Sequence, residues 1–357
     1  MGLGELILGL VAKGAAWWKS SGLKKAQAAK APAMLQRDLE SSQRAMLGEF
    51  SSKPPEWLQR CMAQAKATRR AQRLDLIDRA VGSCPDHVDA ATRLRGDMDE
   101  VENMRCAKAV YGARDVPTGP MPPGFKAPSE QDLAGMGLSQ DMLTPKNSKF
   151  TAAVYMKDPA VWGPSPEPAA VVAFRGSTPA YQDWKNNFAQ GLNVESDYYR
   201  RAAEIGTALA SNDASAQVVG HSLGGGLASA AQGASGLPAS TYNAAGLNAA
   251  TVSRYAGKGL AAQAEQIQAI RVQGETLTKM QEQGAFSRFM DDAVGQKRNI
   301  APATAEQSFN AMKQAGQIGA GEDYETYLHG MDEVIGSMEA SKSADEMALK
   351  DCVRGAA

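Results

Sequence analysis

One segment restricts the possible folds of this chain more than any other. It is residues 218–226, which read Val-Val-Gly-His-Ser-Leu-Gly-Gly-Gly. They join an apolar run typical of a buried strand to an alanine-rich segment typical of a helix, through the spacing Gly-x-Ser-x-Gly. Such a turn holds its serine in a strained conformation, and a Cβ at Gly220 or Gly224 would collide with the neighbouring strand or helix. We expect Ser222 at the apex of this turn, as a nucleophile; the simpler interpretation is a serine that caps an ordinary helix.

The segments around this turn alternate between strand and helix patterns. Short apolar or β-branched runs occur at residues 150–156, 169–174, 216–219, 241–243 and 269–272, and helical patterns occur at residues 197–210 and 222–236. Strands that alternate with helices are typical of a sheet that is largely parallel and covered on both faces. The pattern therefore predicts an α/β fold.

The first third of the chain has a different character. Residues 34–103 are rich in Ala, Arg, Gln, Leu and Glu, with apolar residues at helical spacing. We predict a helical N-terminal region at residues 1–107 and an α/β domain at residues 108–357. Residues 115–146 are dense in proline and glycine, so we expect an irregular connection there, and its composition makes it a candidate lid.

Composition excludes several classes of protein. The 357 residues contain 38 Lys and Arg against 39 Asp and Glu, a net charge of −1 that does not favour nucleic-acid binding. The hydrophobic content of 43% is enough for a large core. The four cysteines are far apart and lack nearby histidines, so we expect neither a metal site nor a cofactor. Reduced thiols are the expected state, and a bridge from Cys84 to Cys106 is the alternative.

The amino terminus does not have the pattern of a secretory signal. Its apolar run, residues 6–11, is too short to span a membrane, and the basic residues from Lys19 onward follow this run instead of preceding it. We therefore expect no export by a signal peptide. With Trp17 and Trp18, residues 1–19 could form a helix at a membrane surface, or they could pack on the rest of the protein.

A nucleophilic serine needs a general base, and the chain has only three histidines. His87 lies in the helical region, ahead of the serine, whereas α/β-hydrolases place their residues in the order serine, acid, histidine. The side chain of His221 should point away from its neighbour across the tight turn, which favours a structural role. Elimination leaves His329 as the expected base.

The acid that orients this histidine should lie between Ser222 and His329, just after a strand. Glu275 fits best, because it follows the strand pattern at residues 270–272 and a Gln-Gly bend. Asp291 and Asp292 are alternatives in a second stretch that could form a loop at the sheet edge, with Asp292 the stronger. For each of these carboxylates the simpler interpretation is a solvated surface residue.

A second motif follows the strand at residues 169–174. Residues 174–178 read Phe-Arg-Gly-Ser-Thr, and residues 183–187 read Asp-Trp-Lys-Asn-Asn. Together with Gly-His-Ser-Leu-Gly-Gly-Gly, they resemble the class 3 lipase family of α/β-hydrolases over about residues 150–329. The resemblance implies an α/β-hydrolase fold in which the backbone N–H groups of Ser177 and Leu223 bind the oxyanion. The chain departs from the family in having Glu275 where an aspartate is usual, which keeps Asp292 open.

The chain is also similar to bacterial lipase-type effectors, phospholipases that some bacteria deliver into competitors through contact-dependent machines such as the type VI system. The similar segments are residues 109–111, 184–191, 220–231, 243–247 and 272–278. This resemblance implies a serine phospholipase that leaves the bacterial cytoplasm without a signal peptide and attacks the target-cell membrane from the periplasm. An immunity protein and a secretion adaptor would be its partners. The alternatives are a cytoplasmic carboxylesterase or neutral-lipid lipase, and an inactive membrane-binding or adaptor protein.

Overall fold

The computed structural model describes residues 56–113, 121–177, 195–256, 264–283 and 291–356. The chain divides into two units, residues 1–59 and residues 60–357, and the description below concerns the second unit. The amino-terminal stretch 1–19 and the similar segment 184–191 lie outside the described residues, so the predictions made for them stay predictions.

A seven-stranded sheet lies at the centre of the second unit, with its strands in chain order. The strands are β1 (Phe125–Lys126), β2 (Ala152–Lys157), β3 (Ala170–Phe174), β4 (Ala216–His221), β5 (Ala239–Tyr242), β6 (Ile267–Val272) and β7 (Gln296–Ile300). The pairs β1–β2 and β2–β3 are antiparallel, and every pair from β3 to β7 is parallel. This sheet confirms the predicted α/β class. The hydrophobic pattern does not predict β1, which has only two residues, or β7, an edge strand of polar residues.

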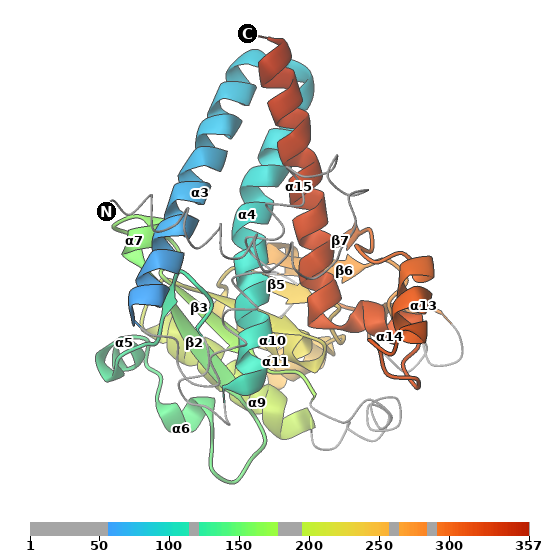
Figure 1. Ribbon diagram of the computed structural model, residues 1–357. Coiled ribbons are helices and arrows are strands. Elements are labelled where there is room, and N and C mark those ends of the chain that lie inside the picture. Colours follow the sequence, from blue (N-terminus) through green and yellow to red (C-terminus); the bar gives the residue numbers. More distant parts are fainter. Residues whose placement is uncertain (1–55, 114–120, 178–194, 257–263, 284–290, 357) are drawn as a thin grey trace. The chain divides into compact units, whose positions relative to one another are not determined.

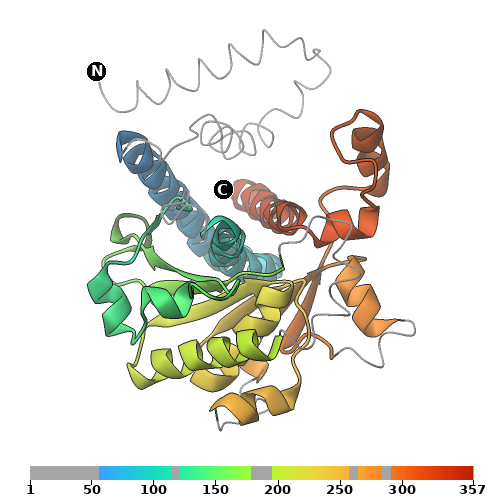
Figure 2. The same ribbon diagram turned by 90° about the horizontal axis from the view of Figure 1, so that it is seen from below.

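One face of the sheet packs against α9 (Glu195–Ser211), α10 (Leu223–Ser235) and α11 (Ala249–Ala256). Alternate side chains such as Val172 and Val218 enter this layer, with leucines and alanines of α9 and α10. Figure 2 shows these helices on one side of the sheet, while α4 and α15 lie on the other. The parallel crossovers on this face bring the carboxyl ends of β3 to β6 to a common edge, which is where ligand sites of such sheets lie.

The opposite face is covered by α4 (Val88–Ala109) and α15 (Met331–Gly355). Val171 and Val219, which point away from the first layer, pack here against apolar residues of both helices. The predicted boundary at residues 107 and 108 stays a prediction, and in the structure α4 is part of the cover of the sheet. The helix nevertheless begins far from the sheet, in the bundle described next.

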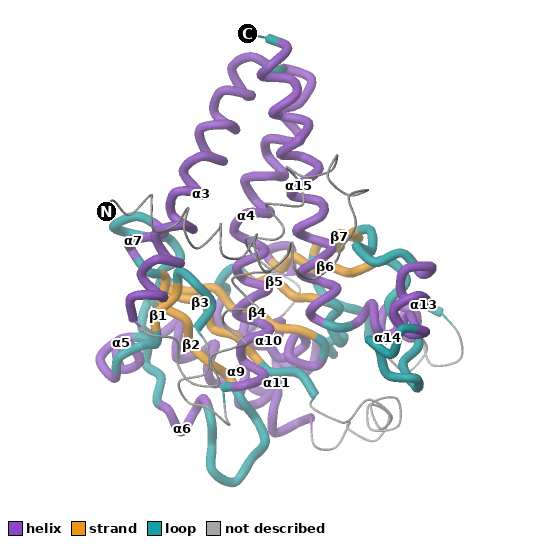
Figure 3. The backbone as a smooth tube through the Cα atoms, viewed as in Figure 1, coloured by secondary structure: helices purple, strands orange, loops and turns teal. Residues whose placement is uncertain are grey.

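Beyond the sheet, α4 and α15 form a bundle with α3 (Glu56–Ser83), which Figures 1 and 3 show as three long helices that run together away from the strands. An apolar cluster that includes Ile77, Leu94 and Leu349 joins the three helices near their far ends. A disulfide between Cys84 and Cys352 closes this end of the bundle, with the two Cα atoms 6.2 Å apart.

This disulfide corrects the prediction of reduced thiols, and it also excludes the alternative Cys84–Cys106 bridge. The true pair is separated by 268 positions in the sequence, so no spacing motif reveals it. The two cysteines meet because α3 ends beside the carboxyl-terminal part of α15. Cys106 is instead buried in α4, and Cys61 and Cys106 are outside any disulfide.

The shorter elements connect this frame. They are η2 (Pro85–His87), η3 (Val110–Gly112), α5 (Glu130–Gly135), α6 (Gln140–Leu143), α7 (Pro159–Trp162), η5 (Ala264–Gln266), α12 (Thr276–Glu282), α13 (Glu306–Gln314) and α14 (Tyr324–His329). The proline-rich stretch at residues 115–146 is thus only partly irregular, because β1, α5 and α6 lie within it. In the described ranges, no helix combines the length and the apolar character that a membrane crossing requires.

Candidate active site

Ser222 lies on the sharp turn between β4 and α10, as the motif predicts. Its backbone has a positive φ, with φ 58° and ψ −128°, a combination that non-glycine residues rarely adopt. The turn is held to the next strand by a hydrogen bond of 3.0 Å from Ser222 N–H to the carbonyl oxygen of Tyr242. A strained backbone that the surrounding strands enforce is typical of functional sites.

The flanking glycines are required by close packing. A Cβ added at Gly220 would lie 1.9 Å from the carbonyl oxygen of Gly224, and one at Gly224 would lie 2.2 Å from that of Phe174. Both contacts are far shorter than atoms tolerate, and both involve backbone, which cannot move aside. The glycines therefore allow the first turn of α10 to approach β3 and β4 closely.

The hydroxyl of Ser222 is buried, and it has no hydrogen-bond partner among the described residues. A buried hydroxyl without a partner is uncommon and calls for a functional explanation. Ser222 also directly precedes the first residue of α10, Leu223. The N-terminus of this helix stabilises negative charge that develops near the serine.

The chain after β3 runs directly past the serine. A Cβ added at Gly176 would lie 3.3 Å from the Cβ of Ser222 and 2.6 Å from the carbonyl oxygen of His221. Ser177 is the next residue. Of the two predicted oxyanion donors, Ser177 thus directly follows a residue packed against Ser222, and Leu223 is the first residue of α10, directly after Ser222.

Glu275 lies just after β6, where Gly274 turns the chain with a φ of 84°. Its side chain is fully buried and caps α12: one carboxylate oxygen accepts from Leu277 N–H at 2.8 Å and the other from Thr278 N–H. The first oxygen also lies 2.7 Å from Nδ1 of His329. Burial raises the pKa of Glu275, but the hydrogen bonds from His329 and Thr278 outweigh it and leave the pKa below its usual value.

His329 is the last residue of α14 and is 5% exposed. Because an ionised Glu275 can only accept, Nδ1 of His329 carries the proton of their hydrogen bond. Nε2 is then the nitrogen of a neutral ring that can accept a proton. The ring centroid lies 4.8 Å from that of His221, the neighbour of Ser222 in the chain.

Asp292, the stronger alternative acid, has other partners. Asp292 forms an ion pair with Lys297 and lies 3.7 Å from Nη1 of Arg271. Its side chain is 36% exposed, whereas that of Glu275 is buried. Asp291, the third candidate, is exposed. Among the predicted acids, Glu275 is therefore the one that the structure pairs with His329.

The other two histidines do not pair with Glu275. His87 belongs to η2, at the far end of the bundle. His221 is buried, and its ring lies between two partners: Nδ1 is 2.8 Å from the hydroxyl of Tyr111, and Nε2 is 2.8 Å from the carbonyl oxygen of His329. Burial, with the nearby His329, lowers the pKa of His221 to about 3.

Two residues at the site have no predicted role. Tyr111 follows α4, and Asn243 follows β5, where its amide donates to the carbonyl oxygens of Leu328 and His329, each at 3.1 Å. Both belong to segments that resemble lipase-type effectors, 109–111 and 243–247. That resemblance marks the segments, but it does not show that these side chains meet at His329.

Within the described residues, no group of three or more His, Cys, Asp or Glu side chains could hold a metal ion. The site instead combines a strained serine, a buried glutamate–histidine pair and closely packed glycine loops at the carboxyl edge of a mostly parallel sheet. This is the architecture of the α/β-hydrolases.

Within that class, the chain belongs to the Tle-like phospholipase domain family, a phospholipase-like family that matches residues 102–322. The matched range contains Ser222 and Glu275 and ends shortly before His329. The chain is also 30% identical, over 224 residues, to a protein described as extracellular phospholipase A1 from Serratia liquefaciens. The alignment covers 61% of this chain and 65% of that protein.

Proposed function

We propose that this protein is a serine hydrolase that cleaves a carboxylic ester of phospholipids. The observation that carries the proposal is the strained Ser222, with its buried hydroxyl, on the same sheet edge as the hydrogen-bonded pair of Glu275 and His329. Membership of a phospholipase family supports the substrate class.

In the proposed mechanism, the Ser222 hydroxyl attacks the ester carbonyl while Nε2 of His329 takes its proton. The backbone N–H groups of Ser177 and Leu223 bind the resulting oxyanion, and His329 returns the proton to the departing lysophospholipid oxygen. Water then attacks the acyl-enzyme by the same route and releases a fatty acid. Two oriented donors of this kind contribute several kcal/mol to stabilising the transition state.

Glu275 has an electrostatic role in this scheme. Its hydrogen bonds keep the carboxylate ionised despite burial, so it stabilises the imidazolium that forms when His329 takes the proton. The same carboxylate holds His329 with Nδ1 protonated, which leaves Nε2 for the serine. Its function as cap of α12 fixes the carboxylate itself, because two backbone N–H groups of that helix bind it.

The similar Serratia protein suggests which ester bond of the phospholipid is cleaved. The Serratia protein is described as a phospholipase A1, and we propose the same cleavage, at the sn-1 ester, for this chain. Soluble short-chain esters and neutral lipids are the alternative substrates. They are compared directly with phospholipid by mass spectrometry of the products from vesicles, triglyceride emulsions and short-chain esters.

The decisive experiment measures hydrolysis of phospholipid vesicles by Ser222→Ala beside a matched Ser229→Ala control. Ser229 is also a buried serine of α10, but its hydroxyl donates to the carbonyl oxygen of Gly225 within the helix. We expect activity to vanish in Ser222→Ala and to persist in Ser229→Ala. Full activity of Ser222→Ala would refute the proposal.

A fluorophosphonate probe tests the alternative of an inactive membrane-binding or adaptor protein. We expect the probe to label the protein with one equivalent, and the label to disappear in Ser222→Ala. An unlabelled, correctly folded protein would instead favour the inactive alternative.

We further propose that the enzyme is an antibacterial effector that acts on the membrane of a target cell from the periplasm, with an immunity protein and a secretion adaptor as partners. The resemblance to lipase-type effectors supports this role. The Cys84–Cys352 disulfide also supports action in an oxidising compartment. Expression of the chain in the periplasm of a susceptible bacterium should kill it, and Ser222→Ala should not; survival with both would contradict the effector role.

A further inference from the structure

His221 stands next to the candidate nucleophile, yet the proposed mechanism gives it no task. We infer that Tyr111 and His221 form a hydrogen-bonded relay that positions the backbone of the base, His329, relative to the oxyanion loop at Gly176. This inference rests on the proposed function and adds two positioning residues to it. Neither residue donates to or accepts from the substrate in the mechanism above.

The partners of His221 fix the direction of every hydrogen bond in the relay. The carbonyl oxygen of His329, 2.8 Å from Nε2 of His221, can only accept, so Nε2 carries the proton. In a neutral ring Nδ1 then accepts, and the hydroxyl of Tyr111, also at 2.8 Å, donates to it. The ring of His221 is thus held in one tautomer by a donor on one side and an acceptor on the other.

The ring is also neutral near pH 7. Burial, with the neighbouring His329, lowers the pKa of His221 to about 3. Burial likewise raises the pKa of Tyr111, so its phenol keeps the proton that it donates. The relay therefore does not change its direction as the pH varies around neutrality.

At one end, the relay reaches the oxyanion loop. The hydroxyl of Tyr111 lies against the backbone of Gly176, the residue directly before Ser177. Only glycine fits at this point, because an added Cβ would lie 2.3 Å from that hydroxyl. Tyr111 thus restrains the backbone one residue before Ser177, whose N–H is the proposed oxyanion donor.

At the other end, the relay reaches the base. The carbonyl oxygen of His329 accepts from Nε2 of His221 at 2.8 Å and from the amide of Asn243 at 3.1 Å. The side-chain oxygen Oδ1 of Asn243, in turn, accepts from Val272 N–H at 2.9 Å, at the end of β6. The backbone of the base is thus tied to the ends of three neighbouring strands, β4 through His221, β5 through Asn243 and β6 through Val272.

Rigid placement of this kind affects the transition state more than substrate binding. The general base and the oxyanion donors must be correctly spaced at the same moment, and a displacement of about 1 Å can reduce the rate by about 100-fold. Because the relay contacts the backbone on both sides of the nucleophile, its loss should lower kcat and leave KM nearly unchanged.

The test compares Tyr111→Phe with Tyr155→Phe. Both tyrosines pack with the same apolar cluster on one face of the sheet, but Tyr155 belongs to β2 and lies outside the relay. We expect Tyr111→Phe to lower kcat by about 10- to 100-fold with little change in KM, and Tyr155→Phe to lower it by less than about twofold. Equal kcat values for the two variants, at equal thermal stability, would overturn the relay.

A second pair of variants keeps the test decisive if Tyr111→Phe unfolds. His221→Gln retains one donor and one acceptor, whereas His221→Leu has neither. We expect His221→Gln to keep more of the wild-type kcat than His221→Leu does. The same kcat in both variants would show that only the volume of the ring matters, which would also overturn the relay.

Failure of the relay is distinguishable from failure of the proposed function. The fluorophosphonate probe should still label Tyr111→Phe to one equivalent, but more slowly than the wild type. If Ser222→Ala is inactive while Tyr111→Phe matches its control, only the relay is wrong. If Ser222→Ala is fully active, the proposed function itself fails.

Discussion

Two buried glutamates, Glu275 at the candidate active site and Glu346 in the helical bundle, differ in the kind of partner that binds the carboxylate. Both have a pKa below the usual value, although burial alone would raise it. Glu275 is held by His329 and by backbone N–H groups, whereas Glu346 accepts from Arg69, Arg73 and Lys350. Only the first carboxylate is paired with an imidazole, which can accept and release a proton, so only the first can take part in proton transfer.

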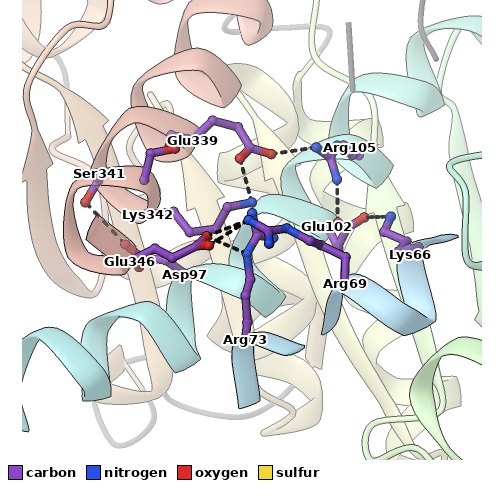
Figure 4. Close-up of polar contacts among 11 residues, drawn as sticks. Lys66, Arg69, Arg73, Asp97, Glu102, Arg105, Glu339, Ser341, Lys342 and Glu346 are labelled. Carbon is purple, nitrogen blue, oxygen red and sulfur yellow. Dashed lines mark hydrogen bonds and ion pairs between the residues drawn. The ribbon is translucent and has the colours of Figure 1, made fainter. Parts of the chain in front are cut away.

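The surroundings of Glu346 show what such permanent pairing achieves. Figure 4 shows polar side chains of α3, α4 and α15 converging between the helices in several hydrogen-bonded groups. Besides Glu346, Glu102 pairs with Lys66 and Arg105, and Glu339 pairs with Arg105 and Lys342. Further from the sheet the same helices are joined by apolar contacts and the disulfide. We therefore expect changes in the bundle to affect stability, and changes at Glu275 to affect the rate.

The largest effect should come from Glu275→Gln. The amide has nearly the size of the carboxylate, but it cannot stabilise a positively charged His329 as the carboxylate does. We expect kcat/KM for phospholipid vesicles to fall by about 1,000- to 10,000-fold, since neutralising the acid of such a triad has an effect of that size. Thermal unfolding should also show a loss of stability, of about 1–3 kcal/mol, because both carboxylate oxygens accept from N–H groups and the amide –NH₂ cannot.

Glu282→Gln is the matched control, because Glu282 is also on α12 but pairs with Arg271. Its kcat/KM should remain near that of the wild type. A comparable loss in both variants would mean that the helix, and not the carboxylate at His329, is responsible. The contrast between the two glutamate environments would then fail.

Next in size is removal of the disulfide by Cys352→Ser. The bond joins residues 268 positions apart, and loss of a disulfide usually lowers the free energy of unfolding by about 2–4 kcal/mol. Denaturant unfolding should show a loss of about 3 kcal/mol, while kcat at low temperature stays unchanged. Cys61→Ser, which alters a cysteine outside any disulfide, is the control. A reductant that destabilises Cys352→Ser as much as the wild type would contradict this explanation.

The contrast between local patterns at the active site and distant contacts in the bundle also explains how much of the structure the sequence could predict. Local patterns identify β3, β4 and α10, because each combines a clear period with a glycine turn. They also lead to Ser222, whose motif is contiguous, and chain order with only three histidines leads to His329. For Glu275 the position after a strand is enough to place it ahead of Asp292.

Contacts between distant segments could not be predicted in this way. The Cys84–Cys352 disulfide depends on the lengths and packing of two helices, and no local spacing records that. Tyr111 meets His221 only because the end of α4 lies across the carboxyl edge of the sheet. β7 is missed because its five residues include four polar ones, at the edge of the sheet.

A smaller effect is expected from Glu346→Gln. Hydrogen bonds to charged groups typically contribute about 1.5–3 kcal/mol, so we expect a loss of about 2 kcal/mol in the free energy of unfolding and no change in kcat. Arg73, Lys350 and Arg69 overcome the effect of burial and hold the pKa of Glu346 at about 2, against an ordinary value of 4.5. A carboxylate with a lowered pKa stabilises the fold fully above the ordinary pKa, and that contribution disappears as the pH falls through the lowered one.

The pH dependence gives this prediction its check. Wild type and Glu346→Gln should differ most near pH 7, and the difference should close as the pH falls from about 4.5 to about 2. Lys350→Met removes the least buried of the three cations and should be milder, because Arg69 and Arg73 remain. A stability difference that does not depend on pH would show that the ion pairs of Glu346 do not stabilise the bundle.

The smallest effect should come from Asp292→Asn, the variant that challenges the choice of acid. Asp292 and its partner Lys297 are both more than one-third exposed, and ion pairs of this kind contribute about 0–1 kcal/mol. We expect kcat/KM within about twofold of the wild type and a change in unfolding free energy below about 0.5 kcal/mol. A loss of activity as large as that of Glu275→Gln would instead identify Asp292 as the acid. The hydrogen bond between Glu275 and His329 would then be structural. Both buried glutamates, Glu275 and Glu346, would stabilise the fold, and neither would act in catalysis.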